Sequence, residues 1–488
     1  MRLQTVAATI AGLALRLFLV LRFPFSDDSD SLIYDQLARN LKDHRVYGLW
    51  VAGHLQAADV RVPGYPLFLD ATWSTGRHHW PAPGAYVQVL ADLLTCFLIA
   101  GIAARLAPRE SRDRVWIAGL WLAALCPFIA NYCTTELTEV LAVFFTALSL
   151  WFLVQPGGMA NLPASERLHW NSSRPTEAIP PGSLANRTAF AAGIAAGCGA
   201  LVRPETPLVV MAAGAVLAWR CWRPVHWRVL FRTGLLIVCG VILPLAPWAM
   251  RNWITLHEVQ FLNPRNVELP GEYVVVGVNS WTGTWMWRMR DVFQVLWKVD
   301  GDLIALTDVP DSAFDSAAER ARVAKLLALY NHTYNTTMTP KIDAGFAQLA
   351  RERTARHPLR TYLKIPLLRI FGMWFTPRVE LLGYDGRLWP VTDAWENSPL
   401  DFSISGLLVL VNMFLLALAV AGWWRARHHP AVAFLIAFIL LRTVFFTQVE
   451  SPEPRYMLEC FPAVLALGAQ TWISRAPRPA SFKSAPVT

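Results

Sequence analysis

Carboxylates crowd the sequence just after its first apolar stretch and reappear inside a later one. The segment Ser26-Asp27-Asp28-Ser29-Asp30 holds three acids where the cap of a following helix needs one. Glu139 lies within the apolar run Leu137–Leu141. Acids in such places are costly unless they serve a function. We predict Asp30, Asp28 and Glu139 as catalytic candidates, with helix capping and N-terminal charge complementarity as the alternatives.

Four arginines lie where apolar stretches end or begin on the predicted outer side. Arg61 belongs to the proline-locked turn Arg61–Pro66, and the others are Arg203, Arg251 and Arg455. Arginine is disfavoured on that side, so a bound anion could explain them, whereas a loop turn or snorkelling are the alternatives. Arginines that hold phosphate, beside a carboxylate base, suit a reaction on an anionic, lipid-anchored substrate.

The composition says which elements must position these residues. Of 488 residues, 54% are hydrophobic and only 16% are charged, which is too little charge to cover soluble domains. Disorder, collagen and coiled coil are excluded by the same figures. Seven cysteines in such a long chain make no disulfide framework. The sequence therefore predicts an integral membrane protein.

Apolar runs long enough to cross a bilayer recur along the chain, and they predict an all-α polytopic fold with ten spans. The predicted spans are Leu3–Leu21, Gly84–Ala104, Val115–Tyr132, Leu137–Val154, Ala189–Val202, Pro207–Trp219, Leu230–Trp248, Ile404–Trp424, Ala431–Phe446 and Tyr456–Ile473. Tyr362–Phe375 is also apolar but carries Lys364, Pro366 and Arg369. We predict an interfacial helix there; the alternative is an eleventh span with the C-terminus outside.

The basic residues predict the orientation, because cytoplasmic loops are rich in Lys and Arg. With a cytoplasmic N-terminus, the short outer loops are nearly free of Lys and Arg, and most arginines of the short loops lie inside; among them are Arg105, Arg109, Arg112, Arg114, Arg425 and Arg427. The +9 net charge is thereby explained without nucleic acid. Residues 23–83 and 252–403 then lie outside, and residues 475–488 form a basic inner tail.

We divide the chain into a catalytic membrane module (1–251), a large outer segment (252–403), C-terminal spans (404–474) and the tail. Within the outer segment, Tyr273–Trp285 suggests strand or irregular structure. A helix opened by a capping box at Ser312-x-x-Asp315 is predicted to run to Tyr330, and a second helix over Pro340–Arg356. The inner loop 155–187 has the composition of a linker.

These residues, in this order, resemble the GT-C class of membrane glycosyltransferases, which includes the dolichyl-phosphate-mannose-protein mannosyltransferases and the bacterial lipid A aminoarabinose transferases. The family's first outer acid, shortly before a tyrosine, is similar to Asp30 before Tyr34, with Asp28 second. Its basic-Pro-Pro element resembles Arg61-Val62-Pro63, where valine replaces the first proline. The resemblance covers Leu3–Asn252 well and extends weakly to Arg455-Tyr456.

The resemblance implies a polyprenyl-phosphate sugar donor and inverting transfer on the extracytoplasmic face of the cell membrane. It implies that Asp30 acts as base or positions the acceptor, which could be protein, lipid or glycan. Arg61, Arg203, Arg251 and Arg455 would bind the donor phosphate. Tyr34, Tyr65 and Tyr456 are candidates for the substrate pocket. A divalent metal at Asp28, Asp30 and Glu139 stays open, because carboxylates alone do not establish one.

Two other functions fit the hydrophobicity. A transporter or flippase of a lipid-linked sugar should place charge near the membrane centre, often in repeated halves. Arg16 and Arg442 lie deep in apolar runs, but the other charges gather at the outer edge and no repeat is visible. A scaffold for envelope synthesis would explain neither the acids nor the outer arginines. The sequence favours the transferase.

Overall fold

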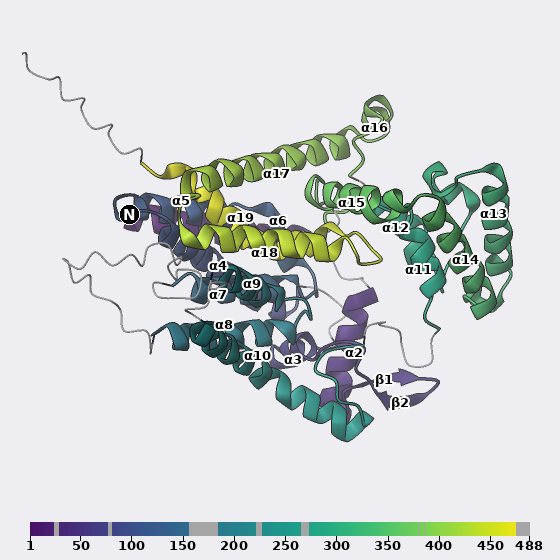
Figure 1. The fold of residues 1–488 in the computed structure, drawn as a ribbon, viewed down its shortest axis with the longest axis horizontal. Coiled ribbons are helices and arrows are strands. Elements are labelled where there is room, and N and C mark those ends of the chain that lie inside the picture. Colours follow the sequence, from purple (N-terminus) through teal and green to yellow (C-terminus); the bar gives the residue numbers. More distant parts are fainter. Residues whose placement is uncertain are drawn as a thin grey trace, which may run out of the picture.

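The computed structural model describes residues 1–23, 29–76, 81–155, 184–220, 227–264, 273–379, 381–384 and 386–474. Asp28, most of the predicted linker and the basic tail lie outside this described part. Helices dominate the rest, which confirms the all-α prediction (Figure 1). The N-terminus lies at the end of the helical bundle away from α11 to α14 (Figure 1).

Each predicted span lies on helical structure. Four helices are long and apolar enough to cross a membrane, and a fifth crossing is possible as a bent pair. This count covers the described residues only. The total of ten spans and their orientation therefore remain predictions. The apolar helices are α1 (Arg2–Arg22), α4 (Pro83–Leu106), α5 (Arg112–Ala124), α6 (Pro127–Ala130), α7 (Glu139–Leu153), α8 (Leu184–Ala200), α9 (Leu208–Arg220), α10 (Trp227–Leu256), α17 (Pro399–Ala426), α18 (Pro430–Phe446) and α19 (Phe461–Gly468).

The third predicted span is broken, and a buried ion pair holds the break. The helices before and after Leu125-Cys126 meet at 46°, since Pro127 cannot continue α5. The Arg16 guanidinium of α1 donates to the freed Ala124 carbonyl at 2.8 Å and pairs with Asp92 of α4 at 2.7 Å. The deep position of Arg16 is thus explained by helix packing.

The segment between α1 and α4, predicted as the first outer loop, has its own small elements. It contains α2 (Ser29–His44), an antiparallel hairpin of β1 (Gly48–Val51) and β2 (His54–Ala57), and α3 (Gly64–Ala71). The sequence predicts the α2 helix after the acidic segment, but it does not predict the hairpin. Gly64 lies so close to the end of α8 that an added Cβ would come within 2.5 Å of the Leu201 carbonyl oxygen. The turn before α3 is therefore fixed against the membrane bundle.

The second outer segment has its own apolar core around Trp281, Trp285 and Phe346. It contains α11 (Val276–Thr282), α12 (Met289–Gln294), α13 (Ala317–Asn331) and α14 (Pro340–Arg356), which lie together at one end of the molecule (Figure 1). The prediction for α14 is confirmed residue by residue. The prediction for α13 was wrong about the cap, because Ser316 rather than Ser312 accepts from a backbone amide, that of Glu319.

The prediction of strand or irregular structure for Tyr273–Trp285 was wrong. The α11 helix forms there because the Asp343 carboxylate of α14 accepts bonds from the Gly277 and Val278 amides, both at 2.8 Å. These amides would otherwise lack partners at the helix start. The cap comes from a residue far along the chain, so that local patterning does not reveal it.

The segment predicted as interfacial contains a π-helical turn (Arg360–Lys364) and α15 (Ile365–Trp374), followed by α16 (Val391–Asn397). Arg369 is buried and donates to the carbonyls of Met286, Thr447 and Val449 at 2.8 to 2.9 Å. It therefore joins the outer segment to the turn after α18. Its depth relative to a bilayer stays a prediction.

Candidate active site

A pocket of about 540 Å³ opens where the first outer loop meets the ends of the apolar helices. Most of the residues that the sequence analysis singled out line it, although they come from five separate parts of the chain. The predicted residues in its lining are Asp30, Tyr34, Arg61, Glu139, Arg203, Arg455 and Tyr456. Folding thus brings acids and arginines into one cavity.

Asp30 lies between two arginines in this pocket. Its Oδ1 is 2.7 Å from Nη2 of Arg61, and its Oδ2 is 3.4 Å from Nη2 of Arg455. Burial by itself raises the pKa of Asp30, but the two guanidinium groups outweigh burial and hold the pKa below its ordinary value. Asp30 is the second residue of α2, where the helix N-terminus also favours a negative charge.

Arg61 is held in place through its backbone. The Tyr47 hydroxyl donates to the carbonyls of Arg61 and Val62 at 3.0 and 3.3 Å. The Gly64 amide, three residues on, donates to the Leu201 carbonyl at 2.6 Å. The side chain of Arg61 contacts Asp30, and the proline-locked turn therefore fixes the position of its guanidinium group.

Arg203 and Glu139 form the second ion pair. Arg203 follows α8 and its Nη1 lies 2.8 Å from Oε1 of Glu139, the first residue of α7. Its Nε lies 3.2 Å from Glu205. Glu139 Oε2 is buried and has no hydrogen-bond partner among the described residues. This oxygen can accept a bond from a substrate hydroxyl.

A buried network lies behind Arg203. The Glu459 carboxylate is 3.8 Å from Arg203 Nε and 2.6 Å from Arg442 Nη2. It also accepts from the hydroxyls of Thr146 and Thr206 at 2.7 and 3.2 Å. Glu459 and Arg442 are almost fully buried. The deep position of Arg442 is explained by this contact, which limits how far Arg203 can move.

Aromatic side chains also line the pocket. Phe446 of α18 stacks on Tyr456 with ring centroids 4.5 Å apart, and the Arg203 guanidinium carbon lies 5.5 Å from the Tyr456 ring. The Tyr456 hydroxyl donates to Glu453 at 2.8 Å, and Glu453 also pairs with Arg455. The pocket therefore joins a charged end to an apolar one.

Three predicted residues are not among those that line the pocket. Tyr65 is fully buried and donates to Gln88 Oε1 at 3.0 Å. Arg251 donates to the carbonyls of Tyr47 and Ala58 at 2.5 and 3.0 Å, so that it ties α10 to the first outer loop. Asp28 lies outside the described residues. The structure supports packing roles for Tyr65 and Arg251.

The sequence analysis missed several acids near these arginines. Glu205 and Glu450 line the pocket, while Glu453 and Glu459 contact its arginines. The signal was present in Arg203-Pro204-Glu205 and in Glu450–Arg455, where acids flank each arginine within a few residues. Every arginine of the pocket is therefore ion-paired, and an anionic ligand must compete with carboxylates for it.

The same pairing bears on a metal. Within the described ranges, no group of three His, Cys, Asp or Glu side chains could hold a metal ion. Asp30 and Glu139 each face arginines, so a divalent cation between them would lie among three guanidinium groups. Asp30 and Glu139 alone do not make a divalent metal site, Asp28 lies outside the described residues, and no step below passes through a metal.

No family model matches the chain, and no curated protein matches it. Its fold is similar to AglB, the Archaeoglobus fulgidus oligosaccharyltransferase, solved with an inhibitory peptide and a dolichol-phosphate (12% identity, 96% of this chain, 49% of that chain, TM-score 0.47). It is also similar to the complex of the Archaeoglobus fulgidus oligosaccharyltransferase with Zn and sulfate (11% identity, 96% of this chain, 48% of that chain, TM-score 0.44).

A second kind of neighbour is ArnT from Cupriavidus metallidurans in the apo state, with 13% identity, 96% of this chain, 77% of that chain and a TM-score of 0.33. Both kinds are GT-C glycosyltransferases, the class that the sequence resembles. The chain spans about half the length of the archaeal enzyme. At these identities and TM-scores, the likeness does not define an activity.

Proposed function

We propose that this protein is an integral membrane glycosyltransferase that moves a sugar from a polyprenyl-phosphate donor to an acceptor on the extracytoplasmic face. The observation that carries the proposal is the position of Asp30 between Arg61 and Arg455, in a pocket that also holds Arg203 and Glu139. A carboxylate beside phosphate-binding arginines, at the end of apolar helices, suits a lipid-linked anionic donor.

The arginines would bind the donor phosphate and stabilise the charge that grows on it. When the bond between the sugar C1 and the phosphate oxygen breaks, its electron pair stays on the phosphate. Arg61, Arg203 and Arg455 all line the pocket and would supply N–H donors to that oxygen. Stabilisation of developing charge by fixed donors is usually the largest part of such catalysis.

Asp30 would act on the acceptor. The acceptor oxygen attacks C1 from the face opposite the phosphate, which inverts the configuration, and the acceptor proton passes to the Asp30 carboxylate. A carboxylate whose pKa lies below its ordinary value is a weak base. If the acceptor is itself a phosphate, no proton needs to be removed, and Asp30 would orient it instead.

Donor binding would change this weak base into a stronger one. A phosphate that takes up donors of Arg61 and Arg455 draws them away from Asp30, with which both are paired in the structure. Losing those partners raises the pKa of a buried carboxyl. Asp30 would therefore become a competent base only once the donor is present, which limits wasteful activation of the acceptor.

The apolar end of the pocket would take the first part of the prenyl chain. Phe445 and Phe446 at the end of α18 line the pocket, as do Val449 in the turn that follows and Leu262 after α10. Phe445 is 44% exposed, so the pocket is not closed on that side. A prenyl chain could leave the pocket there towards the bilayer.

The test is to identify the lipid that the protein binds. The full chain would be purified in mild detergent and its bound lipids measured by mass spectrometry, and binding of undecaprenyl phosphate would be measured by thermal shift. We expect a co-purified polyprenyl-phosphate sugar, and stabilisation by undecaprenyl phosphate that is lost in an Arg61→Ala, Arg455→Ala double variant. Arg39→Ala is the control, because Arg39 pairs with Asp35 on the same outer layer. Equal stabilisation of all three proteins would remove the pocket from donor binding.

A transporter of lipid-linked sugars is less well supported. The two arginines deep in apolar helices, Arg16 and Arg442, are both engaged in buried ion pairs with Asp92 and Glu459. These pairs join helices to each other.

A further inference from the structure

A second cavity, of about 620 Å³, lies apart from the candidate active site. It runs between α5 and α17 and is bounded by Trp472 of the short 3-10 helix Ala469–Trp472. Apart from Arg114 and Cys126, its lining side chains are aliphatic or aromatic; they are Ile117, Ala118, Trp121, Leu122, Leu125, Val411, Phe414, Leu415 and Trp472. We name it the α5–α17 groove.

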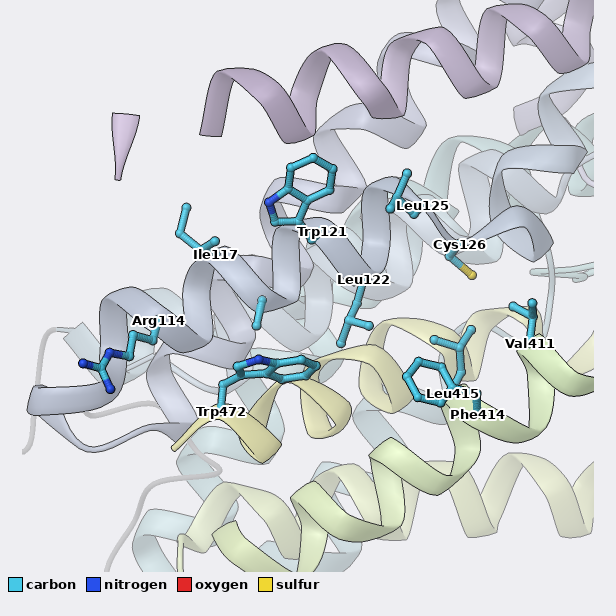
Figure 2. A pocket seen from close by; sticks show the side chains of 11 residues that line it. Arg114, Ile117, Trp121, Leu122, Leu125, Cys126, Val411, Phe414, Leu415 and Trp472 are labelled. Atoms are coloured by element: carbon cyan, nitrogen blue, oxygen red, sulfur yellow. The ribbon is translucent and has the colours of Figure 1, made fainter. Parts of the chain in front are cut away.

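The one charge of the groove lies at one end. Figure 2 shows Arg114 at one end of the row of side chains, with Cys126 and Val411 towards the other. Arg114 is exposed and its Nη1 donates to the Ser474 hydroxyl at 2.9 Å. Arg425 of α17 reaches the same segment, where it donates to the carbonyls of Thr471 and Ile473. Two arginines from two helices therefore flank one end of an apolar groove.

The length of the groove matches one leaflet. At 1.5 Å per residue, the helical stretch from Arg114 to Leu125 rises about 16 Å, and half of a typical hydrocarbon core is about 15 Å. Trp472 lies between Thr471 and Ile473, whose carbonyls accept from Arg425, and tryptophan is favoured at the boundary between headgroups and acyl chains. The groove therefore has the profile of a single acyl chain below an anionic headgroup.

The groove also lies in the leaflet opposite the candidate active site. The continuous helical segment Pro454–Trp472 has Arg455, which lines the active-site pocket, at one end and Trp472, which lines the groove, at the other. At 1.5 to 2.0 Å per residue, that segment spans about 25 to 34 Å, which is the thickness of a bilayer core. In the predicted orientation this leaflet is the cytoplasmic one, which carries the anionic phospholipids.

We propose that the α5–α17 groove binds one anionic phospholipid, with an acyl chain along the groove and the phosphate at Arg114 and Arg425. Charge complementarity and the one-leaflet length select this occupant over a neutral lipid or a peptide. The site does not depend on the transferase activity. It would fix α17 against α5, next to the break after Ala124.

Native mass spectrometry of the full chain tests this proposal. The delipidated protein would be titrated with phosphatidylglycerol or with phosphatidylcholine of the same acyl chains. We expect one phosphatidylglycerol per chain to be retained about 25-fold more tightly than phosphatidylcholine. An Arg114→Ala, Arg425→Ala double variant should lose most of that preference, since each arginine near a headgroup contributes roughly fivefold.

Two further variants separate the groove from general charge. Arg112→Ala removes the same charge next to the groove, because Arg112 is exposed at the start of α5 but does not line the cavity; it should keep the preference. Leu125→Trp should fill the groove and weaken the binding of both phospholipids. The binding of undecaprenyl phosphate in the candidate active site should stay unchanged. Equal retention of the two lipids by the wild type, or an equal loss in Arg112→Ala, would overturn the proposal. So would displacement of phosphatidylglycerol by equimolar undecaprenyl phosphate.

Discussion

Arg455 pairs with Asp30 across 425 positions of the sequence, with its Nη2 3.4 Å from the Asp30 Oδ2. The contact joins the helical segment that follows α18 to the first outer loop. It places one guanidinium group where it can serve either the carboxylate or a bound phosphate, but not both fully. The proposed coupling between donor binding and the basicity of Asp30 follows from this shared position.

The first prediction concerns pH. Arg61 helps to hold the pKa of Asp30 below its ordinary value, so Asp30 stays ionised well into the acid range. Arg61→Ala removes the nearer guanidinium, which should raise the pKa of Asp30 and move the acid limb of the kcat/KM profile to higher pH. The profile of Arg39→Ala should match the wild type. An unmoved limb in Arg61→Ala would show that Asp30 is not the group that titrates.

The second prediction concerns Glu459, which we regard as a positioning residue for Arg203. Glu459→Gln keeps the shape but weakens the hold on both Arg442 and Arg203. We expect the donor KM to rise about tenfold while kcat falls less, because ground-state and transition-state contacts of the phosphate are lost together. Glu459→Asp should recover part of the loss. A fall in kcat alone, with an unchanged donor KM, would contradict this role.

The third prediction concerns the buried pair Arg16–Asp92. Arg16→Met would leave the Asp92 carboxylate and the Ala124 carbonyl without their partner and should destabilise the protein by about 3 to 5 kcal/mol. An Arg16→Met, Asp92→Leu double variant should recover much of that loss, since no charge stays buried alone. Thermal unfolding in detergent measures both. A double variant no more stable than Arg16→Met would contradict the view that the loss comes from the unpaired charge of Asp92.

The fourth prediction is a pH-dependent stability. Burial, helped by the negative charge of Asp35, raises the pKa of Glu136 to about 7. A carboxyl whose pKa is higher in the folded state stabilises the fold below its unfolded pKa, and that stability is lost as the pH rises through 7. With allowance for partial exposure, the cost at alkaline pH is about 2 kcal/mol.

Glu136→Gln removes this titration. The variant and the wild type should therefore unfold at similar temperatures at pH 5, whereas the variant should be the more stable at pH 8. Asp35→Asn should give a smaller gain of the same sign, because the charge of Asp35 is the lesser cause. An equal difference in melting temperature between Glu136→Gln and the wild type at pH 5 and at pH 8 would show that Glu136 is solvated in the folded state.

The sequence could predict the elements whose signals are local. The bounds of α14 were predictable because Pro340 suits the first helical position, and Ile342, Phe346 and Leu349 repeat at helical spacing on its buried face. The α11 helix was missed because its cap, Asp343, belongs to another helix. A helix that depends on a distant partner leaves no local signal.

The same reasoning applies to the site. Charged residues at the ends of apolar stretches could be found from the sequence, because their cost there needs an explanation. The direction of a side chain could not: Arg251 looks like Arg203 in the sequence, yet it turns to the carbonyls of Tyr47 and Ala58. Glu459 was hidden because the apolar run around it was interpreted only as a span.

The central claim is that Asp30 acts on the acceptor in sugar transfer. It is tested most directly by single-turnover transfer from a co-purified polyprenyl-phosphate sugar in proteoliposomes, with the wild type and Asp30→Asn compared at equal donor occupancy. The account predicts that Asp30→Asn slows transfer by about 10² to 10⁴-fold, the usual contribution of a general base, while it binds undecaprenyl phosphate as the wild type does. Transfer by Asp30→Asn at the wild-type rate would contradict the account.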